Sequence, residues 1–186
     1  MTAKTHVLGG MTLALGGFMY LDSSGLLIPD VNKVLQLGII MPYAIWSSTL
    51  PDFDQDKDST AQNSPINFVI QKFFKLIGAG HRSAKSHIIP VIVSFILYLA
   101  IAFNFICKSF NGTEITIIGL ITLGLFLGLT SHMLLDMMTK QALRVGDIEL
   151  RIVPDSDLFT TGSLYESIVR RALYIIVCIL LILIFI

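Results

Sequence analysis

Apolar stretches alternate with polar segments along the whole chain. Residues 88–107 and 115–135 contain no Asp, Glu, Lys or Arg, and both are long enough to cross a bilayer, because a spanning helix needs about 20 residues. Residues 34–50 are also uncharged but shorter, and residues 7–21 and 172–186 are shorter still. The pattern predicts an all-α, polytopic integral membrane protein with about five transmembrane helices.

We expect these helices to form one membrane-embedded domain. The first apolar stretch lacks the strongly basic start and the cleavage site of a signal peptide, so we assign it to the mature protein. Its glycine pairs, Gly9/Gly10 and Gly16/Gly17, are seven residues apart on one helix face, which favours close helix packing in a membrane. The predicted domain spans 1–186, with helices near 6–21, 34–50, 87–107, 115–137 and 166–186 and cytoplasmic loops at 51–86 and 138–165.

The composition supports a membrane location. Hydrophobic residues make up 54% of the chain and charged residues only 14%, whereas soluble domains carry about 25% charged residues. Thirteen basic and thirteen acidic residues cancel, so no global field attracts nucleic acid and we expect no nucleic-acid partner. Cys107 and Cys178 lie in apolar stretches, where cysteines pack like small hydrophobic residues.

The basic residues predict the orientation of the chain. With five crossings, the N-terminus and both long loops share one side of the membrane, and that side holds eleven of the thirteen basic residues. Because basic loop residues favour the cytoplasm, we expect the N-terminus inside and the C-terminus outside. The eleven are Lys4, Lys57, Lys72, Lys75, Arg82, Lys85, Lys140, Arg144, Arg151, Arg170 and Arg171.

All four histidines fall at the predicted cytoplasmic ends of helices. His6 opens the first helix, His81 and His87 lead into the third, and His132 ends the fourth. An acidic run, 52–58, follows the second helix on the same side. Hydropathy and basic-residue bias fix this topology without reference to histidine, so the convergence independently indicates a polar cluster built from four helix ends.

The motif SHMLLDMMT places two polar side chains at the end of a long apolar stretch, where burying them costs free energy. His132 and Asp136 are four residues apart, so both side chains lie on one helix face and can bind one ion or each other. A hydrogen-bonded His–Asp pair at the membrane interface is the simpler interpretation of this motif taken alone, and the metal-binding interpretation gains its weight from the other histidines.

The acidic run LPDFDQDKD offers further carboxylates. Asp52 and Asp54 are two residues apart after a proline, so they can converge in a turn. The run is not an EF-hand calcium loop, because Lys57 and Asn63 stand where that loop needs Gly and Glu. We interpret the later aspartates of the run as a solvated loop.

Mixed imidazole and carboxylate ligands suit zinc, manganese or iron better than magnesium or calcium. The candidates are numerous enough for one or two divalent transition-metal ions, and zinc is the expected metal. The chain contains no Gly-x-Ser-x-Gly elbow, HExxH motif or phosphate-binding P-loop. Any hydrolysis would therefore use a water molecule activated by the metal.

Taken together, the motifs resemble those of the YdjM-like family of bacterial inner-membrane proteins, described as LexA-binding, metal-dependent hydrolases. The resemblance covers nearly the whole chain and rests on Thr5–His6 followed by glycines, LPDFD, HRSAKSH, SHMLLDMMT, and TTGSLYE with Arg170 just beyond. It implies an inner-membrane location and a metal site formed by His6, Asp52, Asp54, His81, His87, His132 and Asp136. Two features depart from the family pattern: Lys85 replaces a threonine, and the segment before Pro154 is longer or more polar.

We expect an enzyme that hydrolyses a phosphoester or phosphoanhydride of a membrane lipid. Asp54 is the first candidate for the general base and Asp52 the second, and Arg82 is the candidate for holding the phosphate, since a guanidinium can grip two oxygens. We interpret Ser163 and Glu166 as a capping box that opens the last helix, with Glu166 as a further ligand in a minority interpretation.

The alternative is a non-catalytic metal-binding membrane protein that acts as a sensor, a scaffold or a transporter. The third and fifth helices carry almost no polar groups, which argues against transport but not against sensing. The sequence leaves the substrate and the metal open, and it is compatible with a homo-oligomer.

Overall fold

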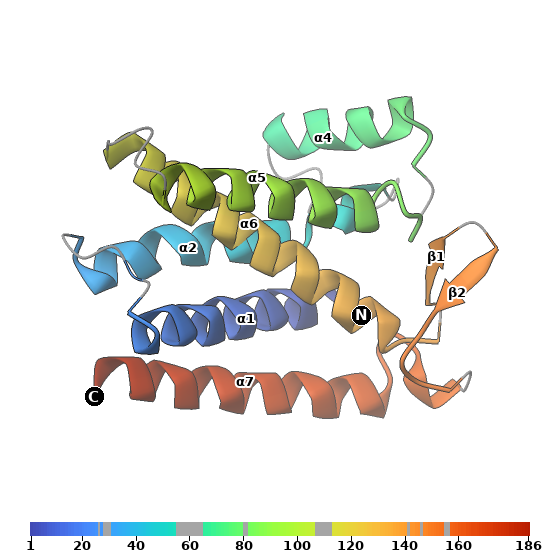
Figure 1. The fold of residues 1–186 in the computed structure, drawn as a ribbon. Coiled ribbons are helices and arrows are strands. Elements are labelled where there is room, and N and C mark those ends of the chain that lie inside the picture. Colours follow the sequence, from blue (N-terminus) through green and yellow to red (C-terminus); the bar gives the residue numbers. More distant parts are fainter. Residues whose placement is uncertain are drawn as a thin grey trace.

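A computed structural model describes residues 1–25, 27, 31–54, 65–79, 82–106, 113–140, 142–145, 147–154 and 157–186. This part of the chain is mostly helical, as expected, and contains six α-helices (Figure 1). They are α1 (Ala3–Ser23), α2 (Lys33–Ser47), α4 (Pro65–Leu76), α5 (Ile88–Ile106), α6 (Thr113–Met137) and α7 (Leu164–Phe185). Two short 3-10 helices, η1 (Leu50–Asp54) and η2 (Asp157–Phe159), and two strands, β1 (Leu143–Val145) and β2 (Ile148–Leu150), complete it.

The central helix is α6, on which α1, α2 and α5 all pack, while α7 packs on α1 (Figure 1). The main hydrophobic core joins Phe18 of α1, Ile40 of α2 and Leu123 of α6. Gly10 lets α1 approach α2, because a Cβ atom there would lie 2.7 Å from the carbonyl oxygen of Ala44. This contact agrees with the close packing that the glycine pairs predict.

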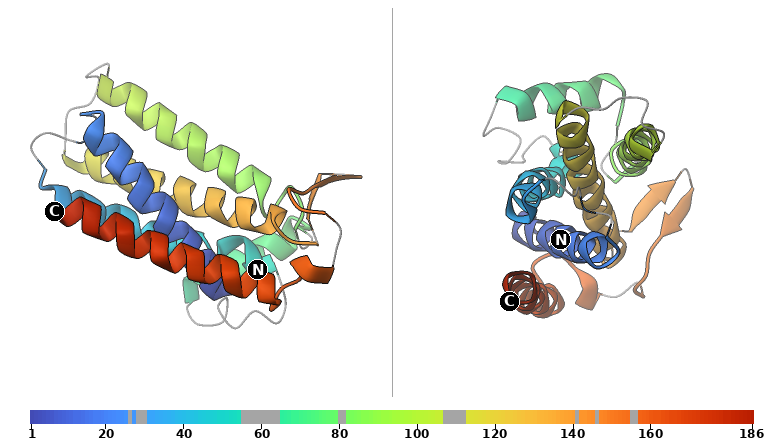
Figure 2. Two further views of the ribbon diagram at one scale, coloured as in Figure 1. Left: turned by 90° about the horizontal axis from the view of Figure 1, so that it is seen from below. Right: turned by 60° about the vertical axis from the view of Figure 1, so that its left-hand side comes forward.

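Two elements lie in segments that we expected to be loops. Helix α4 lies within 51–86, and the antiparallel hairpin of β1 and β2 lies within 138–165, so a small sheet accompanies the helices. Both elements are shorter than a membrane span, and a search for long apolar runs therefore passes over them. In the right view of Figure 2, α5 and α7 are seen nearly end on, whereas α4 lies across the view. It exposes large apolar side chains, including Phe68 and Phe73.

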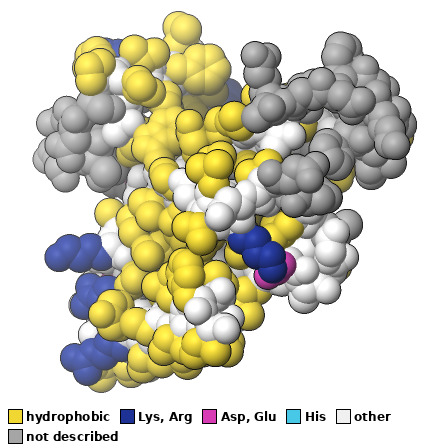
Figure 3. All heavy atoms as spheres, turned by 90° about the vertical axis from the view of Figure 1, so that its left-hand side faces the viewer, with side chains coloured by type: hydrophobic (Ala, Val, Ile, Leu, Met, Phe, Trp, Pro, Cys, Tyr) yellow, Lys and Arg dark blue, Asp and Glu magenta, His cyan; other side chains and the backbone are white. Residues whose placement is uncertain are grey.

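The surface of the bundle exposes many large apolar side chains. Within the described residues, two helical segments are long and apolar enough to cross a membrane, Thr116–Met137 and Leu164–Phe185, and Ile88–Phe103 is a shorter apolar segment. Hydrophobic side chains cover much of the face in Figure 3, and α7 exposes residues such as Ile179 and Leu183. Apolar surface of this extent needs a lipid or protein environment. The count of five spans stays a prediction.

Candidate metal centre

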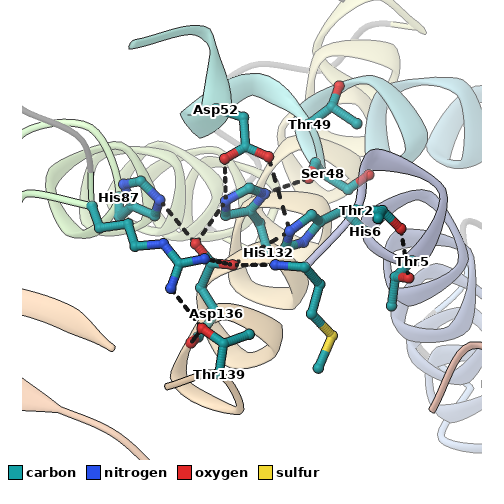
Figure 4. A network of polar contacts seen from close by, with 12 residues as sticks. Thr2, Thr5, His6, Ser48, Thr49, Asp52, His87, His132, Asp136 and Thr139 are labelled. Atoms are coloured by element: carbon teal, nitrogen blue, oxygen red, sulfur yellow. Dashed lines mark hydrogen bonds and ion pairs between the residues drawn. The ribbon is translucent and has the colours of Figure 1, made fainter. Parts of the chain in front are cut away.

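Four separate elements bring five polar side chains together at one end of the bundle (Figure 4). Helix α1 supplies His6, η1 supplies Asp52, the turn before α5 supplies His87, and α6 supplies His132 and Asp136. The three histidines and Asp136 are fully buried, whereas the side chain of Asp52 keeps 14% of its surface exposed. The helix ends converge here as the sequence predicts.

Asp136 lies at the centre of the group. Its Oδ2 atom is 3.4 Å from Nε2 of both His87 and His132, and its Oδ1 atom is 3.4 Å from Nε2 of His6. Asp52 lies slightly further away, with Oδ1 3.7 Å from His132 Nε2 and Oδ2 3.9 Å from His6 Nε2. One ligand atom from each of Asp52, His87, His132 and Asp136 can be chosen so that all four lie within 4.8 Å of one another.

These distances suit ligands around a shared ion better than direct hydrogen bonds. Hydrogen bonds between nitrogen and oxygen are usually about 2.7–3.2 Å long. Ligand atoms at about 2.0–2.1 Å from a tetrahedral zinc ion lie about 3.3 Å from one another. The 3.4 Å separations around Asp136 are close to that value.

Hydrogen bonds outside the group orient the imidazoles. The ring nitrogen Nδ1 of His132 donates to the carbonyl oxygen of Ser48 at 2.7 Å. This bond requires a proton on Nδ1, so in the neutral imidazole the lone pair of Nε2 faces the carboxylates. Nδ1 of His87 lies 2.8 Å from Oγ of Ser86, and the His6 ring stacks on His132 with centroids 3.9 Å apart. Such partners fix the tautomer and the direction of a metal-binding histidine.

Several of the inward-facing atoms are buried and lack a hydrogen-bond partner among the described residues. They are His6 Nε2, His132 Nε2 and Asp136 Oδ2. Leaving a buried polar atom unsatisfied costs about 1–3 kcal/mol, and a cation bound between these atoms would satisfy all three. Nitrogen and carboxylate donors together suit zinc, manganese or iron. The residues therefore fit a divalent transition metal.

Arg82 and Thr139 form hydrogen bonds that hold Asp136 in place. Its Nη2 atom donates to Asp136 Oδ1 at 3.2 Å, and its Nη1 atom donates to Oγ1 of Thr139 at 2.6 Å. Thr139 in turn donates to the backbone carbonyl of Asp136 at 2.8 Å. The amino group of Met1 also lies 3.1 Å from Asp136 Oδ1. Arg82 has φ 57°, a left-handed conformation that non-glycine residues adopt only at some cost in energy.

The guanidinium expected to hold phosphate is therefore already bonded to the cluster in this structure. Arg82→Ala should weaken metal binding about 10- to 100-fold, the usual cost of removing a partner of a metal ligand. Competition with a chelator of known affinity measures this change. Arg144→Ala, at an exposed arginine on β1 whose backbone N–H bonds to the Arg82 carbonyl, is the matched control. Unchanged metal affinity combined with a raised KM for phosphate substrates would favour the phosphate-holding role instead.

Glu166 ties the start of α7 to the start of α1 and is not part of the metal cluster. Its carboxylate accepts hydrogen bonds of 2.6 Å from the backbone N–H of Thr2, from Oγ1 of Thr5 and from the backbone N–H of Gly162. The hydroxyl of Ser163 accepts from the Glu166 backbone N–H at 3.3 Å. The cap at the start of α7 is thus present, and the carboxylate also ties α7 to the start of α1.

Glu166→Gln should destabilise the fold without removing the metal. The amide cannot accept bonds from all of these donors, and losing charge-assisted hydrogen bonds should cost about 2 kcal/mol. For a chain of this size we expect the melting temperature to fall by about 4–8 °C, which thermal unfolding in detergent measures. The exposed Glu149→Gln is the control, and loss of metal at unchanged stability would contradict this role.

Of the seven residues predicted to bind metal, the structure brings five together: His6, Asp52, His87, His132 and Asp136. His81 and the side chain of Asp54 lie outside the described residues. Sequence reasoning assigned Arg82 to substrate binding and left the contact between Glu166 and α1 unrecognised. The capping-box pattern marked the position of Glu166, but nothing local in the sequence connects it with Thr2 and Thr5.

Comparison with known proteins agrees with the resemblance noted from the motifs. The family model described as YdjM inner membrane protein matches residues 1–185, and this range includes all five clustered side chains. No curated protein and no solved structure gives a match. Because the family match covers nearly the whole chain, the protein belongs to the YdjM inner membrane protein family.

Proposed function

We propose that this protein is a membrane-embedded, metal-dependent hydrolase that cleaves a phosphoester or phosphoanhydride of a lipid-like substrate. The observation that carries the proposal is the gathering of three imidazoles and two carboxylates at one end of the bundle. Leaving buried atoms such as His6 Nε2, His132 Nε2 and Asp136 Oδ2 without a hydrogen-bond partner is costly, and metal-assisted hydrolysis is a common use of such a set of ligands.

His6, His87, His132 and Asp136 would hold the ion, which we expect to be zinc, with manganese and iron as alternatives. When bound, the ion supplies a water molecule whose pKa falls towards about 7 and neutralises charge on the phosphate. Ser48 and Ser86 keep the two imidazoles of His132 and His87 directed at the centre. Arg82 and Thr139 hold Asp136 in place.

A carboxylate near the ligands is needed to take a proton from the attacking water. Asp52 suits this task, because its side chain is partly exposed and lies further from the histidines than Asp136 does. Asp54, our first candidate from the sequence, ends η1 only two residues later. The position of Asp52 beside His6 and His132 supports placing it first.

The location of the cluster supports a lipid substrate. His132 and Asp136 lie in the last two turns of α6, at the end of a segment that is long and apolar enough to span a membrane. A lipid headgroup in the same leaflet can reach this depth without leaving the bilayer. By the distribution of basic residues we place this end of the bundle on the cytoplasmic side.

Cysteine labelling tests this orientation. In a chain with Cys107 and Cys178 replaced by serine, Arg151→Cys should react with an impermeant maleimide only after the cytoplasmic face is opened. Lys33→Cys, on the other predicted side, should react in intact cells, and it serves as the matched position. Labelling of Arg151→Cys from outside alone would reverse the topology, together with the cytoplasmic site.

The second candidate is a metal sensor or scaffold without catalysis. The burial of four of the five clustered side chains favours it, because a closed site restricts the access of a substrate. Transport has less support, since α5 and α7 carry few polar groups.

The deciding assay uses purified protein with measured metal content and a panel of nitrophenyl phosphates, phospholipids and lipid pyrophosphates. We expect phosphate release that a chelator abolishes and added zinc, manganese or iron restores. A metal-loaded protein that is inert towards the whole panel would favour the sensor or scaffold.

A further inference from the structure

A groove of about 900 Å³ is lined by residues of α2, α1 and α7. Helix α1 lies between the other two (Figure 1). Each helix presents one face to the groove, because the lining positions recur three or four residues apart. Lys4 and Leu8 of α1 and Pro42 and Trp46 of α2 are examples.

The groove is polarised along its length. Its cations are Lys4, Arg170 and Arg171, and all three lie within the first two or three turns of α1 and α7, near the metal centre. Beyond them the lining is apolar, as at Leu8 and Ile175. No Asp or Glu lines the described walls of the groove, and among the described residues none of the three cations forms an ion pair with a side chain.

We propose that this groove binds one anionic phospholipid. Its phosphate would lie against Lys4, Arg170 and Arg171, and an acyl chain would follow the apolar walls past Leu8 and Trp46. The volume lies within the usual range for ligand sites, about 300–1,000 Å³. Charge complementarity selects an anionic headgroup over a zwitterionic one, since basic side chains at a membrane surface attract anionic lipids.

Residues next in sequence to the metal cluster and its supporting contacts line the groove. Thr49 lines the groove and directly follows Ser48, whose carbonyl oxygen binds His132; Figure 4 shows both beside the cluster. Val7 lines the groove next to His6 in the sequence. The headgroup would therefore lie at the same end of the bundle as the cluster. Its assignment as the substrate rests on the proposed function, whereas the binding of lipid does not.

Trp46 gives a direct test, because it is the chain's single tryptophan and lines the groove. The full-length protein is placed in phosphatidylcholine nanodiscs that contain equal small fractions of either brominated phosphatidylglycerol or brominated phosphatidylcholine. Bromine quenches tryptophan emission on contact. We expect the anionic lipid to quench Trp46 at a mole fraction about tenfold lower than the zwitterionic lipid does. Equal quenching by the two lipids would overturn the proposal.

Variants separate the groove from general surface charge. Arg170→Gln/Arg171→Gln should lose most of this preference, and Lys4→Gln should lose part of it. Lys72→Gln/Arg144→Gln removes the same charge outside the groove and should keep the preference. Loss in this control as well, or full retention in the Arg170/Arg171 pair, would overturn the proposal.

Metal content, measured in the same samples, separates this proposal from the proposed hydrolase. A metal-loaded wild type without lipid preference contradicts the groove assignment alone. A metal-free wild type that keeps the preference supports the groove and contradicts the hydrolase.

Discussion

Purified His132→Ala protein should bind transition metal at least about 100-fold more weakly than wild type, since even partners of ligands contribute about 10- to 100-fold. His132 Nε2 lies 3.4 Å from Asp136 and 3.7 Å from Asp52, between the two carboxylates, and Ser48 fixes its tautomer. Removing the ring leaves those carboxylates facing each other with one donor fewer. Elemental analysis and chelator competition measure the change.

A matched substitution shows whether a loss of metal comes from the missing ligand or from unfolding of the protein. Ser131→Ala alters the preceding buried residue of α6, whose hydroxyl bonds only to the backbone of its own helix among the contacts described. That variant should keep wild-type metal content. If His132→Ala retained full metal content as well, the histidine and Asp136 would be an interfacial hydrogen-bonded pair rather than ligands.

Asp52→Asn should lower hydrolysis by about 100-fold or more, the usual effect of losing a general base, while metal stays bound. Asparagine has nearly the same shape but cannot accept a proton from water at neutral pH. The turnover number, measured at saturating metal, reports the change. Loss of metal in place of loss of turnover would identify Asp52 as a ligand.

Asp54→Asn is the comparison that decides between the two carboxylates. With Asp52 as the base, Asp54→Asn should retain most of the activity. If the large loss fell on Asp54→Asn instead, the order predicted from the sequence would hold. Full activity in both variants would exclude either aspartate as the base.

The convergence of the clustered histidines and aspartates was predictable because it depends on topology more than on detailed packing. His6 and His132 are far apart in the sequence, yet the predicted alternation of spans puts both at helix ends on one side of the membrane. The spacing of His132 and Asp136 then puts both on one face of α6. Hydropathy and charge were sufficient for this step, and the structure brings these side chains together.

The supporting contacts were not predictable in the same way. Arg82 looks like a phosphate-binding residue until Asp136 and Thr139 are seen to occupy its guanidinium. Glu166 at the start of α7 accepts a hydrogen bond from Thr2 at the start of α1. No short sequence pattern predicts a contact between residues so far apart in the chain. Both roles depend on how helices pack side by side, which the periodicity of a single helix leaves undetermined.

The metal content of the wild-type protein decides whether the five converging side chains form a metal site. The full chain is purified in mild detergent without chelators and analysed by inductively coupled plasma mass spectrometry. We predict about one ion of zinc, manganese or iron per chain, or about two if the site holds a pair. Metal content near zero, unchanged after incubation with each ion and removal of the excess, would contradict the account.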